Sequence, residues 1–241
     1  GGLADKREQR DWLNRIKSRA KRKLGRFYPL AIRLLSPVHA RAFLPRFLKT
    51  FDLDRQLVLD LGSGTNQYRD QVVCVDGFAY DNVHLVCDLE KLPLQSNSVD
   101  GLISIAVLEH THQPSGHVAE MKRVLKPGGR VLCYVPFIQG YHASPDDYQR
   151  FTIRGARELF EDFQNIDVQV GAGPMSGLLW IVQEWLAVAL SFGSLRLYRL
   201  LVPVMWLLSP LKYFDLLLAR HPAASVIASG FVVEARKPES Q

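Results

Sequence analysis

The stretch Val58-Leu59-Asp60-Leu61-Gly62-Ser63-Gly64-Thr65-Asn66 runs from a short apolar segment straight into a glycine-rich turn. The segment 57–61 has the composition of a buried strand. Glycines at 62 and 64 let the backbone turn sharply and let a ligand approach main-chain N–H groups that a side chain would block. The stretch therefore predicts an α/β fold with a ligand-binding loop at the carboxyl end of its first strand.

Further β-rich runs follow this loop, separated by turn or helix signals. The next predicted strands are 72–75, 83–87, 101–106 and 130–135. Strands that alternate with helix-length segments are typical of a mostly parallel sheet. The chain is thus predicted to fold as α/β.

Carboxylates stand at the tips of the second and third predicted strands. Asp76 ends the second strand, at the position where an acidic side chain holds the hydroxyls of a ribose. Asp88 follows the third strand. Because open α/β sheets bind ligands along the carboxyl edge, both carboxylates are candidate ligand contacts.

These motifs resemble the class I S-adenosylmethionine-dependent methyltransferases of the small UbiE-like, methyltransferase domain 11 type. The blocks that carry the resemblance are 58–65, Asp76, Asp88 with 92–94 and 98–100, 107–110 and 123–129. The resemblance implies a Rossmann-like, seven-stranded, mostly parallel sheet with S-adenosyl-L-methionine as cofactor. It also implies a sixth strand at 166–170 and an antiparallel last strand at 226–235.

The resemblance also assigns the cofactor contacts. It implies that the first block contacts the methionine moiety of the cofactor, the second block its ribose and the third block its adenine. The implied residues are Asp60, Gly62, Ser63 and Gly64, then Asp76, then Asp88 with Leu89.

Two departures from the family pattern occur in the first block. Asn66 replaces the third glycine, and we expect it to use its tolerance of left-handed backbone angles. Only seven residues separate Gly64 from Val72, so the first crossover helix must be very short or replaced by a loop. The missing glycine and helix disfavour the alternative of a nicotinamide-binding enzyme.

Two polar clusters are candidates for the chemistry. One holds His110, after the fourth strand, for which a packing role in the cofactor pocket is the alternative. The other spans 141–152 and resembles a segment of methyltransferases from glycan and lipid-linked sugar pathways; its alternative is a salt-bridged turn in which Thr152 caps a helix at 153–163. Here His142 is the candidate general base, held by Asp146 or Asp147.

The second cluster also supplies candidates for orienting the acceptor, namely Tyr148 and Arg150. A metal is not expected. The spacing of His110, His112 and His117 is suggestive, but the sequence shows no cysteine or acidic partner that completes a recognisable ligand set.

Charge divides the chain into a basic arm and a mildly acidic body. Residues 1–50 contain 14 Lys and Arg against 3 Asp and Glu, a net charge of +11, and the remainder carries 16 against 21, or −5. The three cysteines are too few for a disulfide framework, and with 47% hydrophobic residues disorder is excluded as well. The arm is predicted to be helical and to contact an anionic membrane surface, with a merely solvated helical face as the alternative.

A second unusual region, 174–224, interrupts the predicted core of 51–173 and 225–241 with very apolar sequence. A transmembrane helix is unfavourable in either half of this region, because the first half contains Gln183-Glu184 and the second half contains two prolines. Trp180, Trp185 and Trp206 with basic flanks instead favour an interfacial, monotopic location. A lid over a hydrophobic pocket and a homodimer interface are the alternatives.

The sequence thus predicts an S-adenosylmethionine-dependent methyltransferase. We expect in-line transfer to an oxygen or nitrogen of a lipid or lipid-linked acceptor, glycolipid or polyprenyl in type, at the cytoplasmic face of the membrane. Two alternatives remain open: a partner-binding protein on a degenerate methyltransferase scaffold, and a methyltransferase of a soluble hydrophobic molecule. Nucleic acid is disfavoured as a partner because the arm lacks interleaved aromatic residues.

Overall fold

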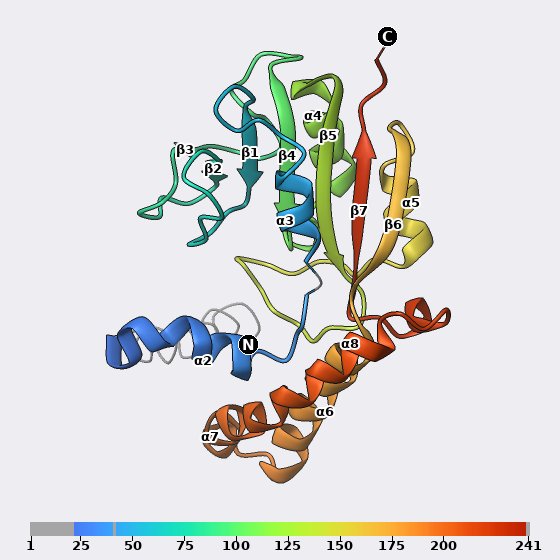
Figure 1. Ribbon diagram of the computed structural model, residues 1–241. Helices are drawn as coiled ribbons and strands as arrows, with labels where there is room; N and C mark the ends of the chain where they lie inside the picture. The colour runs from blue at the N-terminus through green and yellow to red at the C-terminus, as the bar shows by residue number, and fades with distance from the viewer. Residues whose placement is uncertain (1–21, 41, 240–241) are drawn as a thin grey trace.

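A computed structural model describes residues 22–40 and 42–239; the expectations for residues 1–21 lie outside this range. The centre of the molecule is one seven-stranded sheet in the order β3-β2-β1-β4-β5-β7-β6 (Figure 1). Its strands are β1 (Val58–Leu61), β2 (Val73–Asp76), β3 (Leu85–Val86), β4 (Val99–Ile105), β5 (Leu125–Pro136), β6 (Gln164–Ala172) and β7 (Gly230–Arg236).

Strand direction confirms the predicted fold. The pairs among β1, β2, β3, β4 and β5 are parallel, and β7 runs antiparallel between β5 and β6. Leu61 is in register with both Val75 and Ser104, so β1, β2 and β4 end side by side. The carboxyl ends of the parallel strands therefore form one edge, at the bottom of Figure 1.

The connection from β1 to β2 is a loop, as predicted. Residues 62–72, all within the described part of the chain, form turns and bends and contain no helix. The prediction for Asn66 was wrong: the left-handed angles of this loop belong to Gly62 and Gly64. Asn66 instead contributes its carbonyl, which accepts a hydrogen bond from the Asn82 side chain at 2.7 Å.

Helices cover both faces of the sheet. On one face lie α4 (Pro114–Val124) and α5 (Ile153–Leu159), and α5 begins at the predicted cap, where Thr152 Oγ1 accepts from the Gly155 N–H. On the other face α3 (Phe43–Leu48) buries its aromatic side chains against Val58. The sequence assigned α3 to the basic arm, but its apolar contacts make it part of the core.

The remaining helices lie beyond the carboxyl edge of the sheet and form what we call the helical unit (Figure 1). It comprises η1 (Gly25–Phe27), α2 (Tyr28–Leu35), α6 (Pro174–Leu190), α7 (Leu195–Met205), η3 (Trp206–Phe214) and α8 (Asp215–Leu218). Short 3-10 turns, η2 (Leu108–His110) and η4 (Ala224–Val226), belong to the loops at the sheet edge.

The segments α7, η3 and α8 form a single helical run, Leu195–Leu218. Among the described residues it is the one helix whose 24 residues are long and apolar enough to cross a membrane. The sequence predicted an interruption here at two prolines. Pro203 instead lies within α7 and Pro210 within the tighter 3-10 segment η3, so the helical run continues through both prolines.

Buried polar groups hold the helical unit together. Asp215, 3% exposed, accepts hydrogen bonds from the N–H groups of Met175 and Ser176 and from the Ser176 hydroxyl, so it caps the start of α6. Lys212, 1% exposed, donates to the carbonyls of Arg33 and Ser36 at the end of α2. These two side chains of the long run thus fasten both α2 and α6 to it.

Candidate functional site

The glycine loop after β1 needs both of its glycines, for different reasons. Gly62 has φ +73°, and a Cβ there would lie 2.4 Å from Val107 Cγ2. Gly64 has φ +54°, and no described heavy atom lies within 4 Å of its Cβ position. Gly62 thus lets the strand ends pack closely, whereas Gly64 leaves open space beside the backbone.

Beside the glycine loop, two buried polar side chains have atoms without hydrogen-bond partners in the described part of the chain. Asp60 is 2% exposed, and within the described residues its Oδ2 and the buried Ser63 hydroxyl have no hydrogen bond. Burial, together with the Asp76 carboxylate, raises the pKa of Asp60 to about 7. A polar ligand lying on the loop would supply the missing partners.

Asp76 is placed where the sequence predicted it, and it also shapes the loop. Its Oδ2 accepts from the Gly64 N–H at 2.8 Å and its Oδ1 from the Phe78 N–H at 2.9 Å. A carboxylate oxygen has a second lone pair, so each can still accept from a ligand hydroxyl. Asp76 therefore fits the ribose role and fixes the glycine loop at the same time.

Asp88 and Leu89 follow β3 at the same edge. Asp88 is exposed, and its Oδ1 accepts from the Glu90 N–H at 2.9 Å, which closes a short turn. Leu89 is half-buried against the core. The carboxylate is open to the sheet edge, and its contact with adenine stays a prediction.

A second polar cluster forms where η2 meets the segment after β5. The Tyr148 N–H donates to the Glu109 carbonyl at 2.8 Å, which folds that segment back over η2. His142 Nε2 then lies 3.4 Å from Glu109 Oε1, and His110 Nε2 lies 3.8 Å from the same oxygen. The structure thus brings together the two predicted histidines around Glu109.

Glu109 belongs to the first candidate cluster, where the sequence favoured its neighbour His110 as the site residue. It is fully buried, and among the described residues neither of its carboxylate oxygens has a hydrogen bond. Burial lowers the pKa of His142, but Glu109, the Gly140 carbonyl and Asp147 raise it, so this pKa lies above its usual 6.5. The signal in the sequence was an acidic residue beside a histidine just after a predicted strand.

The structure bears on three predicted roles in the segment 141–152, and it selects one of the two carboxylates named for His142. Asp147, rather than Asp146, accepts from the His142 backbone N–H, at 2.7 Å. Each guanidinium N–H of Arg150 donates to Asp147 or to a backbone carbonyl, so Arg150 holds the segment in place. It has no N–H left to orient the methyl acceptor. Tyr148 is half exposed, and its hydroxyl donates to the outward-facing Asp146 carboxylate.

The helical unit adjoins this cluster through Trp180 of α6. The ring centroids of Trp180 and His142 lie 5.3 Å apart. A Cβ at Gly140 would lie 2.6 Å from Trp180 Nε1, so this glycine allows the close approach. The apolar insertion therefore forms one wall of the second cluster.

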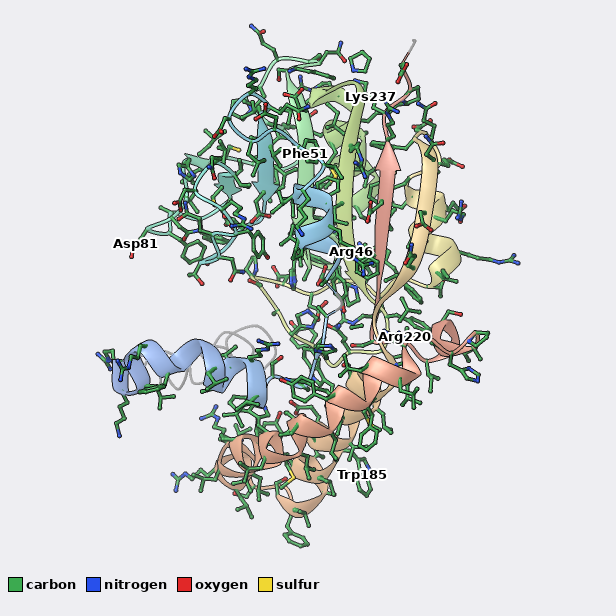
Figure 2. The ribbon with its side chains drawn as sticks, viewed as in Figure 1. Arg46, Phe51, Asp81, Trp185, Arg220 and Lys237 are labelled. Atoms are coloured by element: carbon green, nitrogen blue, oxygen red, sulfur yellow. The ribbon has the colours of Figure 1, made fainter. Side chains whose placement is uncertain are left out.

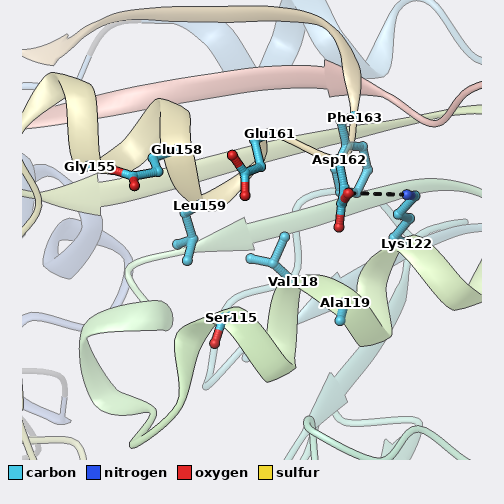
Figure 3. Close-up of a pocket in the computed structure, with 10 residues that line it drawn as sticks. All are labelled: Ser115, Val118, Ala119, Lys122, Gly155, Glu158, Leu159, Glu161, Asp162 and Phe163. Atoms are coloured by element: carbon cyan, nitrogen blue, oxygen red, sulfur yellow. Dashed lines mark ion pairs between the residues drawn. The ribbon is translucent and has the colours of Figure 1, made fainter.

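A cavity of about 370 Å³ lies elsewhere, between α4 and α5 (Figure 3). Lys122 and Asp162 form an ion pair of 3.8 Å at one end of it. None of the predicted site residues lines it. We assign it no part in the site.

The family called "Methyltransferase domain" matches residues 59–133, which include β1, the glycine loop and η2. Residues 59–133 are a class I S-adenosylmethionine-dependent methyltransferase domain. A UbiE ubiquinone/menaquinone C-methyltransferase of Burkholderia mallei is 47% identical over 49 residues, 20% of either chain. The mouse tRNA (carboxymethyluridine(34)-5-O)-methyltransferase ALKBH8 is 44% identical over 54 residues, 21% of this chain and 8% of that protein.

The chain therefore spans a fifth or less of the length of these relatives. Among solved structures, a phosphoethanolamine N-methyltransferase of Haemonchus contortus has TM-score 0.48 and 20% identity, over 76% of this chain and 49% of that one. A 1,6-didemethyltoxoflavin N1-methyltransferase of Burkholderia thailandensis has TM-score 0.47 and 19% identity, over 76% and 71%.

The residues of the methyltransferase domain fit the cofactor of its family. Gly64 has no side chain, so the loop backbone beside it is open to a ligand. Within the described residues, Asp60 Oδ2 and the Ser63 hydroxyl are buried without hydrogen-bond partners. The Asp76 carboxylate oxygens can each accept a further hydrogen bond from the hydroxyls of a ribose. The glycine loop and the tips of β2 and β3 therefore stay the predicted contacts of S-adenosylmethionine.

Proposed function

We propose that this chain is an S-adenosylmethionine-dependent methyltransferase whose acceptor is a lipid or lipid-linked molecule, reached at the cytoplasmic face of a membrane. The observation that supports the acceptor class is the contact of Trp180 with His142. Through it, an apolar helical unit adjoins the polar cluster at the sheet edge. An acceptor with a polar head and an apolar tail would contact both.

The outer surface of the helical unit is strongly apolar. Figure 2 shows Trp185 on the outside of this unit, away from the sheet. The most exposed apolar side chains, with their exposed fractions, are Trp185 (64%), Phe192 (87%), Leu200 (69%), Leu207 (69%), Leu216 (61%) and Leu217 (73%). Water alone does not favour so much apolar surface on one part of a protein.

Exposed cations accompany this surface. They lie within the unit or next to its first and last elements: Arg22, Lys23, Arg26, Arg33, Arg196 and Arg220. Apolar side chains that enter the acyl region, beside cations that remain at headgroup depth, match the two layers of an anionic lipid leaflet. A bilayer surface is thus the partner we propose, with docking in the plane of the membrane.

The proposed chemistry divides between two neighbouring parts of the sheet edge, one after β1 and one after β4 and β5. When bound, S-adenosylmethionine supplies a methyl group on a sulfonium. The chain holds that cofactor at the glycine loop and presents the acceptor at the cluster of Glu109, His110 and His142. As the acceptor hydroxyl or amine gains the methyl group, it releases one proton, and the polar side chains of this cluster are placed to accept it.

Vesicle binding tests the acceptor side. With vesicles containing anionic lipid, we expect the chain to co-sediment, and the combined variant Trp185→Ser, Leu200→Ser, Leu217→Ser to stay in the supernatant. The matched control is Leu57→Ser with Val86→Ser, which removes exposed apolar side chains from the α/β core. Arg22, Lys23 and Arg26 changed together to Gln should weaken binding at low salt only.

Failure of the wild-type chain to bind anionic vesicles at low salt would contradict membrane docking. A concentration-dependent dimer that the same apolar substitutions dissociate would identify a homodimer interface instead. Binding of a detached hydrophobic substrate with no vesicle binding would identify a lid.

Methyl transfer is tested with labelled S-adenosylmethionine and a lipid extract of the source cells. We expect label in the lipid fraction, and a reduction of about 10²–10⁴-fold in turnover for His142→Ala with little change in cofactor affinity by calorimetry. If neither S-adenosylmethionine nor its demethylated product binds, the proposed enzymatic activity is contradicted. The alternative of a partner-binding protein on a degenerate methyltransferase scaffold then remains.

A further inference from the structure

At the second cluster, the Glu109 carboxyl group lies between the ring nitrogens of His110 and His142. His142 Nδ1 lies 2.9 Å from the Gly140 carbonyl oxygen, and His110 Nδ1 lies 2.7 Å from the Asp146 carbonyl oxygen. Because a carbonyl oxygen can only accept, each Nδ1 carries a proton. In the neutral rings, both Nε2 atoms therefore present lone pairs towards the Glu109 carboxylate.

We propose that Glu109, His110 and His142 bind a divalent transition-metal ion through one carboxylate oxygen and two Nε2 atoms. Their ligand atoms all lie within 4.8 Å of one another. Glu109 is fully buried, and within the described residues its two carboxylate oxygens have no hydrogen bond, so a carboxyl group without a partner faces the Nε2 atoms of two imidazoles. A divalent cation satisfies all three groups at once.

The surroundings of the histidines are those of metal ligands. A metal-binding histidine usually donates its second ring N–H to a carbonyl or carboxylate, which fixes its tautomer and the orientation of its ring. Gly140 and Asp146 provide such carbonyls for His142 and His110. Arg150 in turn holds the Gly140 carbonyl with a 2.8 Å hydrogen bond, so the second shell is itself fixed.

The distances suit a small ion. Ligand atoms about 2.1 Å from a zinc ion lie roughly 3.4 Å apart in a tetrahedral site. The Glu109 oxygen lies 3.4 Å from His142 Nε2 and 3.8 Å from His110 Nε2. Small side-chain rotations therefore close the site. Two histidines and one carboxylate leave a coordination position open, as in catalytic rather than structural sites.

This site departs from the expectation of no metal, which considered the histidines by their spacing alone. Of those three, His112 packs against Tyr148 and His117 is fully buried within α4. The missing acidic partner is Glu109, and the missing histidine is His142, which the fold brings from the segment after β5. Metal binding engages the same side chains that the proposed methyl transfer uses to accept a proton, so the ion-bound cluster and the proton-accepting cluster are alternative states. Metal binding is measured without a methyl donor.

The direct test is titration of the purified, chelator-treated full chain with Co²⁺, followed by visible absorption, and with Zn²⁺, followed by calorimetry. We expect one ion per chain. Glu109→Gln, His110→Gln and His142→Gln should each lower the affinity at least tenfold. The matched control is His112→Gln, which removes a neighbouring exposed histidine and should bind like the wild type.

A further variant addresses misfolding. In His142→Cys the thiolate should ligate Co²⁺ and add a sulfur charge-transfer band that the wild type lacks, while circular dichroism confirms the native fold. Absence of stoichiometric binding by the wild type would overturn the proposal and leave a proton-sharing pair of Glu109 and His142. An equal loss of affinity in His112→Gln would also overturn it.

Discussion

The α/β core and the helical unit differ in how much apolar surface they leave exposed. In the core, residues such as Leu59, Ile103 and Phe231 are buried around the sheet. In the helical unit, Lys212 and Asp215 are among the side chains that are buried and hydrogen-bonded, whereas Phe192 is 87% exposed. The core is thus stabilised by excluding apolar surface from water, and the helical unit depends to a greater degree on internal hydrogen bonds.

This difference indicates that the two regions suit different surroundings. A fold that buries its apolar residues needs only water around it. The helical unit uses polar side chains for hydrogen bonds in its interior and exposes leucines on its surface. Such a surface is favourable next to another apolar phase. Substitutions in the two regions should therefore differ in kind as well as in size.

The largest effect is expected for Gly62→Ala in the core. The new Cβ would meet Val107 Cγ2 at 2.4 Å, at a φ of +73° that disfavours any side chain. Strain and overpacking together should cost about 2–5 kcal/mol of unfolding free energy. Gly64→Ala, with open space around its Cβ, should cost about 1–2 kcal/mol in the same denaturant titration. Equal costs would show that Val107 does not set the packing of the loop.

In the helical unit, Asp215→Ala should cost about 2–4 kcal/mol, because the buried N–H groups of Met175 and Ser176 lose their acceptor. The loss should be local, appearing as faster amide exchange at the start of α6 while the sheet stays protected. Asp215→Asn, which keeps one acceptor oxygen, should lose less. Uniform loss of protection across the sheet would mean that the unit and core unfold as one.

A pH effect is expected in the core from Asp60. Its pKa in the folded protein is raised to about 7, above the value of an unfolded chain, so the folded state binds the extra proton between about pH 4 and 7. This contribution to stability is full below pH 4 and is lost as pH rises through 7. In Asp60→Asn the melting temperature should exceed that of the wild type at pH 8, and the gap should narrow towards pH 5. A gap independent of pH would contradict the raised pKa.

The smallest effect should be spectroscopic and report on the helical unit. Trp185 is 64% exposed, whereas Trp180 and Trp206 are half-buried. With anionic vesicles, tryptophan emission should shift to shorter wavelength by several nanometres as Trp185 enters an apolar phase. Trp185→Phe should remove most of the shift and Trp206→Phe should keep it. The reverse pattern would place a different face of the unit on the membrane.

The sequence predicted the core well because its signals are local. A strand, a glycine turn and an acidic tip follow one another within 20 residues, so Asp60, Gly62, Gly64 and Asp76 were recognisable without tertiary information. It predicted the apolar insertion for the same reason. It assigned Phe43–Leu48 to the arm because the basic residues around them dominate the pattern, although the aromatic face packs on the sheet.

By itself, then, the sequence determined the α/β class, the cofactor loop and the presence of an apolar unit, since each is encoded in neighbouring residues. Only the tertiary structure decided which side chains meet at the sheet edge. Glu109 and His142 lie 33 positions apart and come within 3.4 Å because β5 returns the chain beside β4. The hydrogen bond to the His142 backbone N–H comes from Asp147 and not from Asp146. This depends on which of the two adjacent side chains the backbone directs inward, and no local sequence pattern indicates that.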